Sequence, residues 1–181
     1  FRTTDGGATY GQVAKLTASD ATAYDYFGGS VAIDGSTVVI GAYNDNSGRG
    51  SAYVFRTSDG GATYDQVAKL TASDGATYDR FGYSVAIDGD TVVVGAYGND
   101  PGGSAYVFHT EDDGATYDEV AKLTATDAAA DDNFGTSVAV DGGTIVIGTN
   151  YGEAAYVFRT TDGGATYSQV ARLTASDAAG G

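Results

Sequence analysis

The chain contains no cysteine, methionine or tryptophan, a single proline and a single histidine. Without cysteine, it cannot form a disulfide framework, a thiolate nucleophile or a zinc–thiolate site. One histidine, His109, is too few for a histidine metal cage. Residues suited to nucleophilic or metal catalysis are therefore scarce, and we expect the protein not to be an enzyme.

Basic residues are also few, with 9 lysines and arginines against 24 acidic residues and a formal net charge of -15. This balance argues against a nucleic-acid partner, which would need clustered cations, and against docking to anionic lipid. No apolar stretch approaches the roughly 20 residues of a membrane-spanning helix. With 42% hydrophobic and 18% charged residues, the composition is that of a folded, soluble domain. We expect no nucleic-acid partner and no membrane insertion.

Several short segments recur along the chain. QVAKLTASD begins at Gln12 and Gln66 and returns with small changes at Glu119 and Gln169, at intervals of 50–54 residues. FG, one variable residue and SVA follow one another from Phe27, Phe81 and Phe134. Repeats of this length are typical of propellers and solenoids, in which each unit is one supersecondary element.

One unit reads as four strands. In the middle unit we predict strands at Ser84–Ile87, Thr91–Ala96, Ser104–Phe108 and Tyr117–Ala125. Asp88-Gly89, between the first two, is a strong signal for a tight hairpin turn. The second strand, TVVVGA, is apolar without alternation, which indicates that both faces of the sheet are buried.

Four antiparallel strands covered on both faces and repeated in this way predict an all-β fold of β-propeller blades. We divide the chain into blades at 25–78, 79–131 and 132–181, preceded by residues 1–24 as the outer strand of a preceding blade. Propellers usually close with 4 to 8 blades. We therefore expect the ring to be completed by further tandem repeats or by copies of the chain, the latter as a homo-oligomer or an open filament.

The predicted fourth strand carries one cation in each copy. These cations are Lys15, Lys69, Lys122 and Arg172. A cation on an exposed edge strand discourages pairing with foreign strands, which is the role we favour, with a row of ligand-facing cations as the alternative.

The FG…GA pattern resembles the FG-GAP repeats of integrin-like propellers, in the short-loop form of bacterial and algal surface proteins. It is carried by FGGSVAIDGSTVVIGAY, FGYSVAIDGDTVVVGAY and FGTSVAVDGGTIVIGTN. The proline that usually closes the motif is replaced by Tyr43, Tyr97 and Asn150. The resemblance implies a propeller fold and an adhesive or ligand-binding role at the cell surface.

Integrin repeats bind calcium between FG and GA, but here that interval has shrunk to a tight turn. Its residues are Asp34-Gly35-Ser36, Asp88-Gly89-Asp90 and Asp141-Gly142-Gly143. One or two carboxylates cannot supply the six to eight oxygen ligands of calcium. The family's calcium function is therefore not expected at these positions.

A second motif, Thr-x-Asp-x-Gly-x-Thr-Tyr, begins at Thr3, Thr57, Thr110 and Thr160. It resembles the Asp-box of sialidases and other propellers, which is a folding element remote from catalysis. The aspartate can accept backbone N–H bonds within its own turn. We interpret the motif as structural.

The loops that differ between units gather at the opposite end of the blades from the Asp-Gly turns. Their tyrosine, amide and carboxylate side chains are the predicted ligand-binding residues, although such loops also drift without function. The predicted ligand-binding residues are Tyr43, Asn44, Asp45, Asn46, Tyr97, Asn99, Asp100 and Tyr151. Asn44, Asp45 and Asn46 concentrate oxygen ligands and form the candidate metal site, with calcium as the ion; we expect no other cofactor.

We interpret the chain as a non-enzymatic, extracellular or cell-surface, structural and adhesive repeat protein. The alternative is a ligand-binding propeller that uses the variable loops to hold a glycan or a protein. Binding of sugars that depends on Asn44–Asn46 would favour this alternative.

Overall fold

The computed structural model describes residues 1–176, and these form three sheets of four antiparallel strands. Sheet 1 contains β1 (Ser30–Asp34), β2 (Thr37–Ala42), β3 (Ser51–Arg56) and β4 (Asp65–Leu70). Sheet 2 contains β5 (Ser84–Asp88), β6 (Thr91–Ala96), β7 (Ser104–His109) and β8 (Asp118–Leu123). Sheet 3 contains β9 (Ser137–Asp141), β10 (Thr144–Gly148), β11 (Ala155–Arg159) and β12 (Ser168–Leu173).

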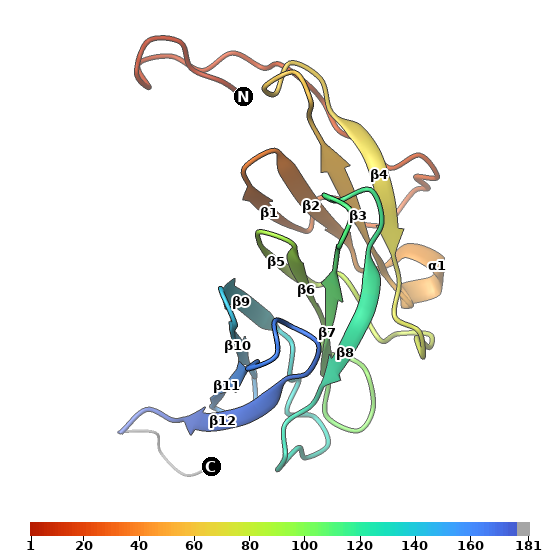
Figure 1. Cartoon of the computed structure of the whole chain (residues 1–181). Coiled ribbons are helices and arrows are strands. Elements are labelled where there is room, and N and C mark those ends of the chain that lie inside the picture. The colour runs from red at the N-terminus through yellow and green to blue at the C-terminus, as the bar shows by residue number, and fades with distance from the viewer. Residues whose placement is uncertain (177–181) are drawn as a thin grey trace.

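The predicted fold class is confirmed, because each repeat forms one four-stranded sheet whose strand order follows the chain. In the middle unit β6 has the predicted bounds, whereas β8 is shorter at both ends than predicted. The three sheets spread as a fan, with β1, β5 and β9 along its inner side and β4, β8 and β12 along its outer side (Figure 1). The fan is an open arc of propeller blades and not a closed ring.

Within the described residues, helical structure is limited to α1 (Asp45–Gly48), which follows β2. Asn46 and Ser47 inside it have φ of 49° and 63°, so α1 is a tight turn and not a regular helix. In residues 1–176 no helix reaches the length and hydropathy that a membrane crossing requires.

Two apolar cores fill the spaces between neighbouring sheets. Val92 and Val94 of β6 face sheet 1, whereas Val93 between them faces sheet 3, and all three are 0% exposed. Successive side chains of a strand point to opposite faces, so both directions are buried only if a sheet lies on each side. The unbroken valine run is therefore explained by the position of sheet 2 between two like sheets.

The segment before sheet 1 packs on its first face. Leu16 and Ala18 belong to the cluster there, just as Leu70 and Ala72 belong to the cluster between sheets 1 and 2. These pairs stand at equivalent positions of the QVAKLTASD repeat. Residues 12–18 thus cover part of sheet 1 in the way that the end of sheet 1 covers sheet 2.

Residues 1–24 contain no strand of a sheet, and their one bridge joins Arg2 to Gly11. Only Phe1 and Arg2 correspond to the third strand, against which an outer strand would pair. The blade boundaries at 25–78, 79–131 and 132–181 stay predictions, and the last five residues of the third unit lie outside the described residues.

The outward face of sheet 3 is not covered by any other sheet of residues 1–176. Leu173 on this face is 52% exposed, whereas its counterpart Leu123 in sheet 2 is 4% exposed. Val146 and Val157 are half-buried, whereas their counterparts Val93 and Val107 are 0% exposed.

Candidate functional site

The FG and GA dipeptides of successive repeats meet at each junction between sheets. Gly41 lies so close to the carbonyl of Gly82 that an added Cβ would overlap the oxygen, and Gly95 lies in the same way against the carbonyl of Gly135. Each carbonyl also accepts a serine hydroxyl, from Ser30 to Gly82 at 2.8 Å and from Ser84 to Gly135 at 2.7 Å. Glycine in GA is therefore required for the close approach of two backbones.

The Asp-Gly turns link the inner strands of neighbouring sheets. The carboxylate of Asp34 accepts the backbone N–H of Gly89 at 2.8 Å, and that of Asp88 accepts the N–H of Gly142 at 2.6 Å. The turn that the sequence identifies as a hairpin signal therefore also joins each sheet to the next. Asp141 holds the same position on sheet 3.

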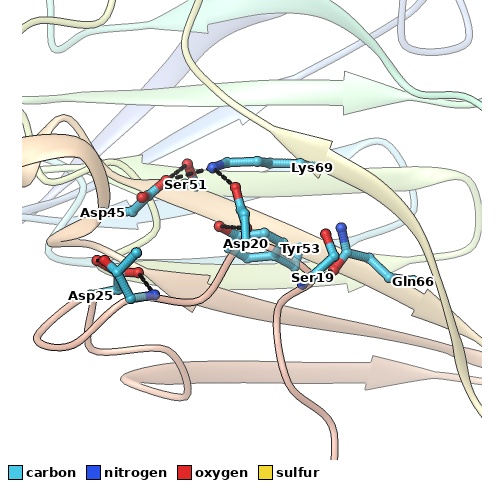
Figure 2. Close-up of polar contacts among 9 residues, drawn as sticks. Ser19, Asp20, Asp25, Asp45, Ser51, Tyr53, Gln66 and Lys69 are labelled. Atoms are coloured by element: carbon cyan, nitrogen blue, oxygen red, sulfur yellow. Dashed lines mark hydrogen bonds and ion pairs between the residues drawn. The ribbon is translucent and has the colours of Figure 1, made fainter.

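A cluster of an aspartate, a tyrosine and a cation, which we call the clasp, joins the segment that ends one repeat to the third and fourth strands of the next sheet (Figure 2). In the first clasp Lys69 Nζ lies 2.5 Å from Asp20 Oδ2 and 2.7 Å from Asp45 Oδ2. Tyr53 donates its hydroxyl to Asp20 Oδ1 at 2.8 Å, and its ring centroid lies 5.2 Å from Lys69 Nζ. Ser51 donates to Asp45 at 2.6 Å, so every carboxylate of the cluster has a partner.

The clasp recurs at both junctions between sheets. At the first, Asp74 binds Lys122 Nζ and the Tyr106 hydroxyl, each at 2.6 Å. At the second, Asp127 lies 3.1 Å from Arg172 Nε, whose guanidinium lies 5.8 Å from the centroid of the Tyr156 ring. In each case the aspartate ends one repeat, and the tyrosine and cation belong to the next.

The clasp gives three of the predicted edge cations a role that sequence analysis missed. Lys69, Lys122 and Arg172 each hold the aspartate of the preceding repeat, whereas Lys15 is exposed. Their role in discouraging foreign strands stays a prediction. The missed signal is that TASD and QVAKL recur together, so the aspartate and the cation have a fixed spacing from one repeat to the next.

Hydrogen bonds and burial shift the pKa values of the clasp groups. Bonds from the cation and the tyrosine lower the pKa of Asp20 and Asp74. Burial, together with the bond to Asp20, raises the pKa of Tyr53 to about 12. Burial alone would lower the pKa of Lys69, but its bonds to Asp20, Asp45 and Tyr53 outweigh this effect and raise it. The ion pair is therefore fully charged at neutral pH.

Each Asp-box aspartate is satisfied within its own hairpin. Asp59 accepts hydrogen bonds from the backbone of Ala62 and from both the backbone and the hydroxyl of Thr63, and Thr57 adds a further hydroxyl. Equivalent bonds lower the pKa of all four Asp-box carboxyls, that of Asp112 to about 2. The contacts agree with the structural interpretation of the motif.

The candidate metal residues largely bind other protein groups. Asp45 is buried in the first clasp, and Asn44 donates to the Tyr24 carbonyl at 2.7 Å and accepts a bond from Arg80. Asn46 is exposed in the turn of α1. Among residues 1–176, no three acidic, histidine or cysteine side chains are grouped to hold a metal ion. Calcium binding at Asn44–Asn46 stays a prediction.

The corresponding loop of sheet 2 separates its two predicted ligand residues. Asn99 is buried, donates to Asp79 at 2.8 Å and accepts the Ser104 hydroxyl at 2.8 Å. Asp100 is exposed beside it. Asn99 therefore positions its own loop, and only Asp100 faces solvent.

Tyrosines from successive repeats form a continuous row at the variable end of the sheets. Tyr26 stacks on Tyr43 with ring centroids 5.1 Å apart, and Tyr43 meets Tyr83 edge to face at 5.4 Å. Tyr83 in turn meets Tyr97 at 4.5 Å. We call Tyr26, Tyr43, Tyr83 and Tyr97 the tyrosine row. It brings together two of the predicted residues, Tyr43 and Tyr97, across the junction of sheets 1 and 2.

A hollow of about 190 Å³ continues the row over the junction of sheets 2 and 3. It is lined by Tyr83, Tyr97, Asn133, Thr136, Asn150 and Tyr151. The predicted residue Tyr151 is thus placed beside Tyr97. Asn133 and Thr136 were not predicted from the sequence, although both stand at variable positions beside the invariant FG dipeptide.

The chain matches the FG-GAP repeat family at residues 10–55, 64–108 and 117–167. No curated protein matches it. Among solved structures it is similar to Sqt1 from Saccharomyces cerevisiae, with 10% sequence identity and a TM-score of 0.53. The similarity covers 81% of this chain and 35% of the Sqt1 chain and concerns the fold alone. Since the three matches span most of the sequence and each contains the FG dipeptide followed by GA or GT, the chain belongs to the FG-GAP repeat family.

Proposed function

We propose that this chain is a non-enzymatic structural and adhesive module of a cell-surface or extracellular protein. Its end sheets are covered by further FG-GAP repeats, supplied by the same polypeptide or by copies of the chain. A head-to-tail contact between copies that does not close into a ring extends into a filament. The proposal is supported by the repeat architecture, by the acidic surface and by the scarcity of catalytic residue types.

The observation that carries the proposal is the open face of sheet 3. Leu173 is 52% exposed where the equivalent Leu123 is 4% exposed, and Val146 and Val157 lie beside it. A contiguous apolar face is favourable only when another surface removes it from water. The other face of sheet 3 packs on sheet 2 in this chain. A surface that resembles that face would fit the open face of sheet 3.

Polar groups at the same face match the internal junctions. Asp141 stands where Asp34 and Asp88 accept a glycine N–H from the next sheet, and Ser137 stands where Ser30 and Ser84 donate to a glycine carbonyl. A further repeat of the same sequence would supply both partners. An unrelated apolar surface would leave Asp141 and Ser137 without these hydrogen-bond partners.

Substitution of Val157 by aspartate tests the proposed covering of sheet 3. We expect the wild-type chain to associate as its concentration rises, measured by sedimentation velocity, because association buries the open face. Val157→Asp should remove this association and leave the melting temperature nearly unchanged, since a half-buried charge on this face can remain hydrated. The matched variant Val107→Asp places the charge at an equivalent, fully buried position and should prevent folding.

A wild-type chain that stays monomeric at every concentration would contradict self-association. Association that persists unchanged in Val157→Asp would show that another surface is responsible.

The second candidate is a ligand-binding propeller that uses its variable loops. It is favoured by the tyrosine row, in which Tyr26 is 54% and Tyr83 is 36% exposed. Partly exposed aromatic rings at a loop-bearing end offer contact area to a ligand at low conformational cost.

A further inference from the structure

The hollow lined by Tyr83, Tyr97, Asn133, Thr136, Asn150 and Tyr151 differs from a larger hollow at the Tyr26 end of the tyrosine row. The larger hollow, about 500 Å³, is lined by Tyr26, Phe27, Gly28, Gly29, Tyr43 and Tyr83. Phe27 and Gly28 are equivalent to Phe81 and Gly82, which contact Gly50 and Gly41 of the preceding repeat. A sheet preceding sheet 1 would therefore cover part of the larger hollow, whereas the smaller one has both of its sheets in place.

The side chains of the smaller hollow are available for binding. Asn133 and Asn150 form no side-chain hydrogen bond with another residue of the described chain, in contrast to Asn44 and Asn99, which are both engaged. Tyr151 is 72% exposed at the rim. The hollow thus combines aromatic rings with free amide donors and acceptors.

Four residues of the smaller hollow, Tyr83, Tyr97, Thr136 and Asn150, occupy positions at which the repeats differ. The position after FG holds Gly29, Tyr83 or Thr136, and the position after the GA or GT dipeptide holds Tyr43, Tyr97 or Asn150. The glycines and serines of the junctions, a few residues away, are the same in every repeat. Packing between sheets explains the constant positions, but it does not require the Tyr, Asn and Thr side chains that face the hollow.

We infer that this hollow binds the sugar units of a neutral glycan. One face of a pyranose ring is formed by C–H groups and packs on an aromatic ring, while its hydroxyl groups need donors and acceptors at the edge. Tyr83 and Tyr97 supply the aromatic surface, and the amides of Asn133 and Asn150 supply the donors and acceptors.

The negative charge of the chain favours neutral ligands among those that stack on aromatic rings. Single-stranded nucleic acid and acidic polysaccharides are repelled by a net charge of -15. A neutral glycan is not repelled in this way. A proline-rich peptide also packs on tyrosines but offers fewer hydroxyl groups to the two amides.

This inference gives a ligand class to the second candidate function. Isothermal titration calorimetry of the whole chain with cellohexaose, laminarihexaose, maltohexaose and mannohexaose should find binding of at least one. Tyr97→Ala should weaken that binding by about tenfold, because it removes a stacking surface. Tyr97→Phe should keep it, and Tyr24→Ala, which alters an 80% exposed ring outside the hollow, is the matched control.

Tyr151→Ala and Asn150→Ala change exposed residues, so their effect on binding can be measured without risk to the fold. Both should weaken binding while leaving the melting temperature unchanged. Val157→Asp should retain binding whatever its effect on association, which separates this site from the end face of sheet 3. Absence of binding to all four sugars, binding that Tyr97→Ala and Tyr151→Ala leave intact, or capture of a proline-rich peptide in their place would overturn the inference.

Discussion

Replacing Gly95 with alanine is expected to lower the free energy of unfolding by about 2–4 kcal/mol, because a methyl group there overlaps the carbonyl of Gly135. The φ angle of Gly95 lies outside the left-handed region, so alanine fits the strand itself. The added Cβ would also meet the Ser84 hydroxyl within sheet 2, but that side chain can rotate away, so the main effect arises from contact between sheets 2 and 3. Denaturant unfolding followed by circular dichroism measures it.

Gly148→Ala is the matched control for Gly95→Ala. Gly148 occupies the same position in sheet 3, but its added Cβ would meet only the side chain of Ser137, which can rotate away. In dilute solution, where the outward face of sheet 3 is uncovered, we expect alanine there to be neutral or slightly stabilising, since it reduces the freedom of the unfolded chain. Equal losses of stability in the two variants would contradict the assignment of this glycine to the junction between sheets.

Lowering the pH below about 4 is expected to destabilise the protein, because ordinary aspartate pKa values lie near 3.9. The folded state lowers the pKa of Asp20, Asp74 and the four Asp-box carboxyls. A carboxyl whose pKa is lower in the folded state stabilises it above the unfolded value, and this contribution is lost as the pH falls through the folded value. The free energy of unfolding should therefore be level near neutrality and fall steeply from about pH 4 toward pH 2.

At alkaline pH, Tyr53 is expected to lose its contribution to stability as the pH rises, the reverse of the aspartates. Its pKa is raised to about 12, so its contribution is present below about pH 10 and is lost as the pH rises through the folded value. Urea unfolding across the pH range, at low protein concentration because the isoelectric point is about 4.1, measures both limits.

Asp74→Asn measures how much one clasp contributes to the loss of stability at low pH. It should lower the free energy of unfolding at pH 7 by about 1 kcal/mol, a value that allows for the partial exposure of Asp74 and Lys122. It should also make the fall of this free energy below pH 4 shallower. Asp118→Asn, at the exposed start of β8, should change neither. Stability that stays level down to pH 2, or an unchanged slope in Asp74→Asn, would refute the role of the clasp.

The repeat and its strands could be predicted because their signals are local. The bounds of β6 follow from the TVVVGA run and the Asp-Gly turn, and the valine run also indicates two buried faces. Resemblance to FG-GAP repeats then identified the blade. All of these depend on residues that are close together in the sequence.

The contacts between repeats could not be predicted in the same way. Asp74 and Lys122 meet only because the sheets stack with a particular offset, and no pattern within one repeat specifies that offset. The loop residues Asn44, Asp45 and Asn99 look like free oxygen ligands in the sequence. In the structure Arg80, Lys69 and Asp79, which lie far from them in the chain, bind these side chains.

Like sheets on both faces are expected to stabilise each sheet of the arc. Native-state hydrogen exchange, followed strand by strand at several protein concentrations, tests it most directly. Amides of β6 and β7 should exchange slowly at every concentration, whereas those of β10 and β11 should exchange faster in dilute solution and become protected as chains associate. Equal protection of all three sheets at every concentration would contradict it.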